Sequence, residues 1–365
     1  MNGLNEAGRV EVLRKFALIA VLVTVCTLAV RSIGSSVGAP PGTRIGPDDY
    51  PPGVNPLTGL AVADASVLAR RPIDVKISNA PPLVRPQAGI GAADIVFEHY
   101  AEGGLTRFSA VFYGQTPERV GSIRSARLID YEVVPMYQGM LAYSGASTGV
   151  GEKIAGSDFA DRVFEGIRFG YPYYWRDESI DAPHNMFTNL AALWELASED
   201  GINTSPDLRG MAFDAAVPPG SAGAATHIDV RYRATRAEWL YDPRNGEYLR
   251  FSDGLPHYDA NTDHQVIADN VVILYARHTL TDIVESEWQG VKSYSIEIEL
   301  WFEGDAVLCR DGQHYDVRWS RPTRESLISL YTRDGEPMPF KPGNTWFQVF
   351  PLPEQQESDE SAMVE

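Results

Sequence analysis

The hydrophobic pattern of the chain changes once along its length, and this change constrains the fold more than any other feature. Residues 56–215 mix short alternating runs, typical of strands, with runs that have helical spacing. Residues 225–352 give only short β-like runs, separated by turn signals such as the Asp-Gly pairs at 253–254 and 311–312. We therefore expect an α+β protein with two domains: a mixed α/β N-terminal domain that contains an antiparallel hairpin, and a β-rich C-terminal domain.

A stretch without any charge, Phe16–Val30, stands near the N-terminus and directly follows Arg14 and Lys15. As a helix it would span about 22 Å, short of a ~30 Å hydrocarbon core unless flanking residues contribute. The basic residues before it predict a cytoplasmic N-terminus and an extracytoplasmic remainder. We therefore expect residues 1–31 to be a membrane anchor or signal segment, and this one hydrophobic helix to precede the folded domains.

Three interpretations of this hydrophobic segment stay open. The first is an uncleaved anchor, which makes the membrane a partner through the N-terminal helix. The second is a cleaved signal peptide, although proline follows the candidate cleavage sequence at 37–39. The third is a lipoprotein signal with Cys26 acylated, but Val25 stands where such signals normally have Gly, Ala or Ser. All three predict a membrane-anchored or exported protein of the cell envelope.

Flexible segments are expected on both sides of the folded part. Residues 32–55 are rich in Gly, Ser and Pro and predict a semi-extended linker, and residues 353–365 predict a disordered acidic tail. The net charge is −18, and residues 1–31 contain four basic and two acidic side chains, so the remainder carries about −20. A field of that sign repels phosphate backbones, which argues against nucleic acid as a partner.

The chain has only two cysteines, Cys26 and Cys309, which lie too far apart in the chain to form a disulfide framework. The sequence contains no Cys/His cluster with zinc spacing. We therefore predict no metal site and no cofactor.

The sequence at residues 94–113 gives the most specific local prediction. Gly103-Gly104, flanked by alternating runs, is a signal for a two-residue hairpin turn, which would pair Glu102 with Leu105. His99 falls on the apolar face, so we expect it to be packed in the core. The opposite face would gather polar side chains within reach of one another, as either a binding surface or merely a solvated face: Glu98, Tyr100, Glu102, Arg107 and Ser109.

Two further clusters complete the candidate site. Arg124 and Arg127 lie on one face of a predicted helix start, where they would grip an anion or form internal salt bridges. The aromatic run 171–175, with the polar residues that follow it, suits sugar rings or a peptide, or is a packed loop. The candidate binding residues are Arg85, Glu98, Glu102, Arg107, Arg124, Arg127, Trp175, Arg176, His184 and Asn185.

One short motif suggests a serine hydrolase. Gly145-Ala-Ser147-Thr-Gly149 fits G-x-S-x-G, and Asp181 and His184 follow in the order that α/β-hydrolases use. However, residues 56–215 do not supply the long alternation of strands and helices which that fold needs. An Asp three residues before a His also rarely lies behind the imidazole. We therefore assign no catalytic residues from this motif.

Several motifs occur in a fixed order along residues 55–352: Asn55–Leu60, Arg85–Gly89, Ala93–Glu98, Glu102–Phe108, Val120–Arg127, Tyr143–Gly145, Ala182–Asn185, Arg310–Gly312, Trp319 and Pro342–Trp346. In these motifs the chain resembles the YerB-like bacterial lipoprotein family, which has separate N- and C-terminal parts of unknown function. The resemblance implies an extracytoplasmic, envelope-associated protein and carries no established activity. Lipoprotein members have an acylated cysteine, and Val25 departs from that pattern.

Two functional hypotheses follow. In the first, a non-catalytic, membrane-tethered envelope protein binds a cell-wall glycan, a peptide or a partner protein through the hairpin, the arginines and the aromatic loop. In the second, a hydrolase cleaves a cell-wall glycan or peptide, with Glu98 and Glu102 as acid and base or His184 as base. One concave pocket that unites these three residues with Arg124 and Arg127 would favour the enzyme, and a scattered arrangement would exclude it.

Overall fold

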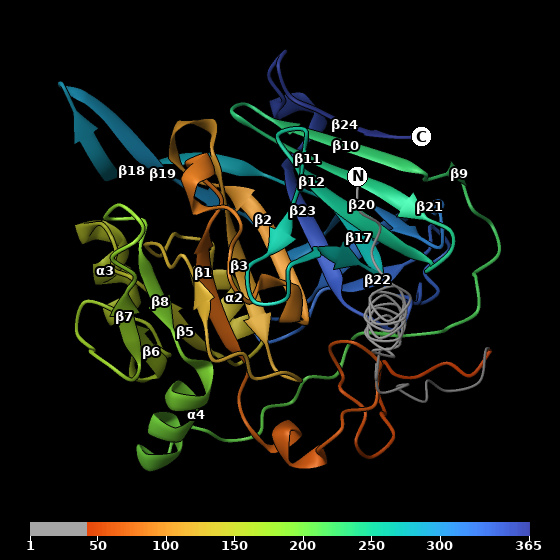
Figure 1. Cartoon of the computed structure of the whole chain (residues 1–365). Helices are drawn as coiled ribbons and strands as arrows, with labels where there is room; N and C mark the ends of the chain where they lie inside the picture. The colour runs from red at the N-terminus through yellow and green to blue at the C-terminus, as the bar shows by residue number, and fades with distance from the viewer. Residues whose placement is uncertain (1–41) are drawn as a thin grey trace, which may run out of the picture. The chain divides into compact units, whose positions relative to one another are not determined.

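The computed structural model describes residues 42–365 (Figure 1). The hydrophobic segment at 1–31 and the first part of the expected linker lie outside the described residues. Among the residues that are described, no helix is both long enough and apolar enough to cross a membrane.

Strands from both halves of the chain form one large mixed sheet (Figure 1). It contains two groups of parallel strands, β1 with β5 and β6, and β2 with β23 and β17, and its other neighbours are antiparallel. Across the sheet the order is β22 (Ser329–Tyr331), β21 (Gln313–Arg321), β20 (Phe302–Arg310), β17 (Asn270–Ala276), β23 (Thr345–Pro351), β2 (Ile95–Tyr100), β3 (Thr106–Phe112), β1 (Ile73–Ser78), β5 (Met140–Tyr143) and β6 (Val163–Glu165), with β9 (Gly223–Ala224) paired to β21.

A second sheet and three small ones complete the strands. The second sheet has the order β13 (Leu255–Pro256), β12 (Glu247–Ser252), β11 (Thr235–Asp242), β10 (His227–Tyr232) and β24 (Ser361–Val364), with β16 (Ile267–Ala268) paired to β12. A long two-stranded ribbon, β18 (His278–Trp288) and β19 (Val291–Ile298), extends from the body (Figure 1). The remaining pairs are β14 (Tyr258–Asp259) with β15 (His264–Gln265), and β4 (Val120–Gly121) with β8 (Met186–Thr188) and β7 (Tyr174–Arg176).

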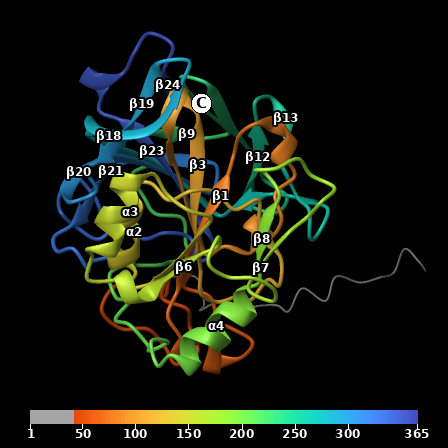
Figure 2. The same cartoon turned by 90° about the vertical axis from the view of Figure 1, so that its left-hand side faces the viewer.

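The helices are few and short. In Figure 2, α2 (Asp130–Met136) and α3 (Thr148–Ala155) lie on the opposite side of β1 from β7 and β8. The third helix, α4 (Leu190–Glu199), begins where the side chain of Asn189 accepts a hydrogen bond from the Ala192 amide at 3.2 Å. Short 3₁₀ turns occur at Ala65–Ala69, Pro82–Val84, Ile90–Ala92, Glu102–Gly104, Ala160–Arg162 and Pro353–Gln355.

Both faces of the main sheet are buried. On one face Trp346 of β23 packs against Trp239 of the second sheet, with ring centroids 5.1 Å apart. On the other face Phe97 stacks on Phe347 at 4.8 Å, next to Met136 of α2. Strands that are covered on both faces tolerate continuous apolar runs, which explains why β23 is buried along its whole length.

The structure refines the two-domain prediction. The N-terminal half holds all three described α-helices and the C-terminal half is all strand apart from one 3₁₀ turn, as expected. However, β2 from the first half pairs in parallel with β23 from the second, from Ile95 opposite Thr345 to Glu98 opposite Gln348. The two halves therefore share one hydrogen-bonded sheet and are not separate bodies joined by a linker.

Two segments that we expected to be flexible are packed instead. Within the predicted linker, Ile45 is buried and exchanges backbone hydrogen bonds of 2.8 Å with Phe213. Within the predicted disordered tail, β24 pairs with β10, and the Glu365 amide donates to the His227 carbonyl at 2.9 Å. For the described residues of both segments the prediction was wrong, because composition does not reveal which distant backbone will pair with them.

The predicted hairpin exists, but its register differs by one residue. β2 and β3 are antiparallel, with Tyr100 opposite Thr106 and Glu98 opposite Phe108, so the loop has five residues instead of two. Gly103 and Gly104 both have positive φ, at 71° and 76°, inside a 3₁₀ turn. A one-residue shift moves side chains to the other face, and both faces of this hairpin are buried, so the expected solvated polar face does not exist.

Candidate functional site

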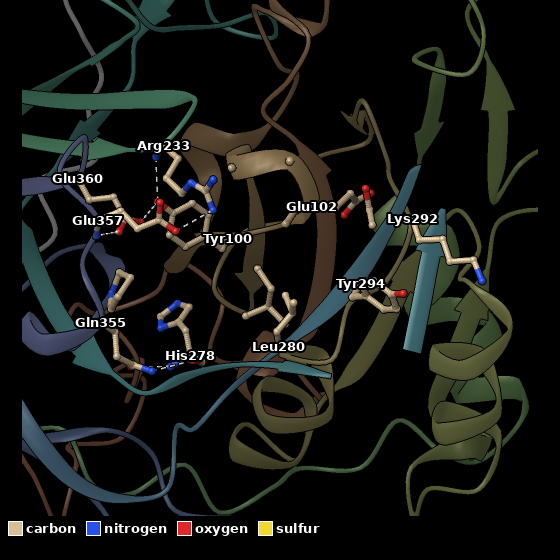
Figure 3. Close-up of a pocket in the computed structure, with 16 residues that line it drawn as sticks. Tyr100, Glu102, Arg233, His278, Leu280, Lys292, Tyr294, Gln355, Glu357 and Glu360 are labelled. Atoms are coloured by element: carbon tan, nitrogen blue, oxygen red, sulfur yellow. Dashed lines mark hydrogen bonds and ion pairs between the residues drawn. The ribbon is translucent and has the colours of Figure 1, made fainter. Parts of the chain in front are cut away.

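A cavity of about 470 Å³ opens between the hairpin loop, the ribbon and the C-terminal segment (Figure 3). Its apolar part comes mainly from the ribbon, where Leu280 stands opposite Ile296. Tyr294 follows on the same face of β19, and the ring of Tyr100 completes this part from the end of β2. Leu280 is 68% exposed, which is unusual for a leucine that lines a concave surface.

Polar side chains form the rim of the cavity. At one end, Figure 3 shows Arg233 reaching Glu357, with Nη1 and Oε1 3.2 Å apart, while the hydroxyl of Tyr100 donates to Glu360. Along another side, the Gln355 side chain donates to the His278 carbonyl at 2.8 Å and accepts from its amide at 3.0 Å. The C-terminal segment is thus held to the ribbon and to the hairpin by hydrogen bonds, and to the turn between β10 and β11 by an ion pair.

Burial favours the neutral form of the His278 imidazole near pH 7. Burial lowers its pKa to about 4, although the hydrogen bond of 2.9 Å between Nδ1 and the Ala276 carbonyl opposes that change. Nε2 is buried and has no hydrogen-bond partner within the described part of the chain. The wall of the cavity therefore contains an uncharged ring packed edge-on against Tyr100, with centroids 5.8 Å apart.

Glu102 lies where the cavity meets the interior. Its carboxylate accepts from Arg107 at 3.0 Å and from Nε of Arg127 at 2.8 Å. Arg127 also lies 3.5 Å from Glu285 of the ribbon, so one guanidinium connects the hairpin loop to β18. Burial by itself raises the pKa of Glu102, but the two arginines outweigh it and lower the pKa to about 2. A carboxylate held in this state cannot act as a general acid near neutral pH.

Glu98 lies on the opposite face of the hairpin and is fully buried. Its carboxylate accepts from Arg250 at 2.6 Å, from Thr106 at 2.8 Å and from Asn79 at 3.0 Å. Arg250 is equally buried, and its Nη1 lies 2.7 Å from Nδ1 of His257, within hydrogen-bond distance. This network joins the hairpin to the second sheet, so Glu98 and Glu102 share no pocket and cannot form an acid–base pair.

His99 is also fully buried, as expected, and lies 3.0 Å from the Lys76 ammonium. The serine-hydrolase arrangement does not form either. Ser147 precedes α3, and no hydrogen bond joins it to His184 among the described residues. The Asp181 carbonyl accepts from the His184 amide at 2.9 Å, so Asp181 meets His184 through its backbone.

Comparison with known proteins shows which family this fold represents. The N-terminal domain of DUF3048, a protein of unknown function, matches residues 57–203, and the C-terminal domain of DUF3048 matches residues 228–347. The chain belongs to the DUF3048 family. A curated relative, the putative lipoprotein YerB of Bacillus subtilis strain 168, is 30% identical over 300 residues, which are 81% of this chain and 86% of the relative.

The crystal structure of the YerB protein from Bacillus subtilis has the same fold. It superposes with a TM-score of 0.69 at 29% identity and covers 85% of this chain and 99% of that chain. The family resemblance noted in the sequence is thereby confirmed. This DUF3048 protein is a homologue of a putative lipoprotein, and the family description assigns no activity.

The DUF3048 fold brings only some of the predicted site residues together. Glu102, Arg107 and Arg127 form one ion cluster, and Arg124 is close enough for its charge to affect the pKa of His184. The other candidates serve separate contacts. Arg85 pairs with Asp253 at 2.6 Å, Arg176 donates to Asn185 at 2.7 Å, and Trp175 stacks on Phe187 with centroids 6.2 Å apart.

Most residues that line the cavity were not predicted. Leu280, Tyr294 and His278 belong to a ribbon whose sequence looks like any amphipathic hairpin. Glu357 and Glu360 stand in the segment that we expected to be disordered. The only available signal was the alternation in the ribbon, and it does not tell which of its faces a distant hairpin loop will cover.

Proposed function

We propose that this protein is a membrane-tethered, non-catalytic envelope protein that binds a glycan or peptide of the cell wall in the cavity between the hairpin loop and the ribbon. The observation that carries the proposal is the composition of that cavity. Rings and aliphatic side chains line one part of it, and hydrogen-bonding side chains line the rest (Figure 3). Sugar rings and extended peptides both present apolar surface beside polar groups, so such a site fits them.

Location supports the same proposal. The uncharged stretch Phe16–Val30 with basic residues before it suits an anchor whose N-terminus is cytoplasmic. The relative YerB is described as a putative lipoprotein. A chain that is tethered in this way meets the cell wall as its nearest polymer.

The proposal is tested by sedimentation of the full chain, in mild detergent, with purified cell wall. We expect the Leu280→Arg variant to lose most of the co-sedimentation, because the long charged side chain fills the apolar part of the cavity. Leu255→Arg is the matched control, since Leu255 is 69% exposed and does not line the cavity. Failure of the unmodified chain to sediment with the wall, or equal losses in both variants, contradicts the proposal.

A further inference from the structure

The backbone of Arg124 lies between two parallel strands of the main sheet, at their carboxyl ends. The parallel strands β1 and β5 are paired from Ile73 to Val75 and then separate toward their carboxyl ends. The segment around Arg124 fills the gap. Its amide donates to the Lys76 carbonyl at 2.9 Å, and its carbonyl accepts from the Ser144 amide at 3.0 Å. In α/β sheets, ligands bind outside the carboxyl ends of parallel strands.

The guanidinium of Arg124 has no acidic partner. Within residues 42–365 no carboxylate lies within 4.0 Å of it, no hydrogen bond is made by its side chain, and its Nε is buried. Its neighbours differ, because Arg107 and Arg127 both bind Glu102. Burial, together with the positive charge of Arg127, lowers the pKa of Arg124, and the more distant carboxylate of Glu102 opposes this only in part. A half-buried guanidinium that no carboxylate contacts directly is unfavourable, and a bound anion would lower that cost.

Two more unused polar groups come from the segments on either side of Arg124. Nδ1 of His184 is buried without a partner, and Ser122 fixes this loop by donating to the His184 carbonyl at 2.6 Å. On the other side, the Gly145 carbonyl accepts from the Ala126 amide at 2.9 Å, and two residues later the hydroxyl of Ser147 is buried without a partner. Ser147 stands directly before α3 and makes no capping hydrogen bond.

We propose that Arg124, His184 and Ser147 bind a phosphate group. A guanidinium offers paired donors that match two oxygens of a phosphate. The imidazole and the hydroxyl come from different segments, so they suit a tetrahedral anion better than a planar carboxylate.

The charge of the whole protein opposes this binding at long range, because residues 32–365 carry about −20. The guanidinium of Arg124 must therefore supply the local attraction for any anion that binds here. The proposed phosphate site does not include any residue that lines the cavity, so it is independent of the proposed wall-binding function.

The test is calorimetric titration of the full chain, in mild detergent, with inorganic phosphate at constant ionic strength. We expect a dissociation constant on the order of 1 mM and at least a roughly tenfold loss in Arg124→Gln, the loss of one charged hydrogen-bonding partner. Arg318→Gln is the matched control, because Arg318 forms an exposed pair with Glu303 at 2.7 Å elsewhere on the surface. We expect it to bind phosphate as the unmodified chain does.

A second variant covers the case in which Arg124→Gln does not fold. Ser147→Ala removes one hydroxyl at a partly exposed position, and we expect it to weaken phosphate binding several-fold while the circular dichroism spectrum is retained. No heat from phosphate, or equal affinity in the unmodified chain and in the folded variants, overturns the proposal. Acetate binding as tight as phosphate overturns it too, because the site would then be a carboxylate site.

Glycerol phosphate distinguishes the source of the ligand. Binding at least as tight as that of inorganic phosphate assigns the site to esterified phosphate, as on a polymer. Weaker binding of the ester assigns it to the free anion. Both results support a phosphate site, and Leu280→Arg, which tests the cavity, leaves both unchanged.

Discussion

Replacing Arg250 with methionine tests whether Glu98 holds the fold together or performs chemistry. The Glu98 carboxylate and the Arg250 guanidinium are both fully buried, with Oε2 and Nη2 2.6 Å apart. In the variant, one carboxylate oxygen keeps its bonds from Asn79 and Thr106, and the other loses its donor. Breaking a buried pair by removing one partner costs about 3–5 kcal/mol of unfolding free energy.

Arg250→Met also removes the contacts of the guanidinium with aromatic rings. Arg250 lies over Trp346 at 4.9 Å and over Phe108 at 5.2 Å, so methionine keeps part of the packing but loses the interaction of the cation with both rings. We therefore expect the upper half of that range, and for a chain of this size a fall in melting temperature of roughly 6 °C.

Urea unfolding followed by circular dichroism measures the effect, with Arg318→Met as the control at an exposed ion pair. The double variant Glu98→Gln/Arg250→Met completes a thermodynamic cycle, and we expect it to cost clearly less than the sum of the two single changes. A loss below about 1 kcal/mol in Arg250→Met, or additive losses in the double variant, would refute the structural role of this pair.

Three further results are expected. The pKa of His278 is about 4 in the folded chain and near 6.5 in the unfolded chain, so the unfolded chain binds an extra proton between these pH values. The free energy of unfolding should therefore fall by up to about 3 kcal/mol as the pH drops from 6.5 to 4. Urea titrations at several pH values measure this slope, and His278→Asn should remove it. The pKa of Glu102 is about 2 in the folded chain and near 4.5 in the unfolded chain, so its contribution to folding stability is present above pH 4.5 and is lost as the pH falls toward 2. Glu102→Gln should lower the free energy of unfolding by about 2 kcal/mol at pH 7, as measured by urea unfolding. No change in that free energy contradicts the ion cluster. Removing residues 352–365 uncovers the edge of β10, which should raise amide hydrogen exchange in the strand His227–Tyr232, and unchanged exchange contradicts its pairing with β24.

The sequence predicted the hairpin but not its register. Two adjacent glycines with alternating runs on both sides are a valid signal that the chain turns, and β2 and β3 do pair. The number of residues in the loop depends on what packs above it, and here a Cβ on Gly104 would lie 2.7 Å from the side chain of Arg233. A contact between residues 129 positions apart cannot be read from the local pattern, and the resulting shift reverses which polar side chains face each other.

Residue type pointed to some members of the candidate site, but it did not reveal their partners. Arg127 was expected to bind an anion or to form internal salt bridges, and the structure shows salt bridges with Glu102 and Glu285, which come from two different elements. The cavity has walls from three segments that are distant in sequence, and nothing in any one segment indicates the other two. The tail was misjudged because acidic composition describes solubility, while its order comes from the free edge of β10.

The pairing of β2 with β23 has a consequence for the way this chain acquires its structure. The N-terminal half is made first, and until Thr345–Pro351 follows, β2 is a strand with one open edge. β23 must then insert between β2 and β17, two strands that stand about 170 positions apart in sequence. Contacts of such long range slow folding and leave an adhesive edge exposed in the meantime. We therefore expect that neither half folds as an independent module, and that the nascent chain is prone to aggregation until β23 has been made.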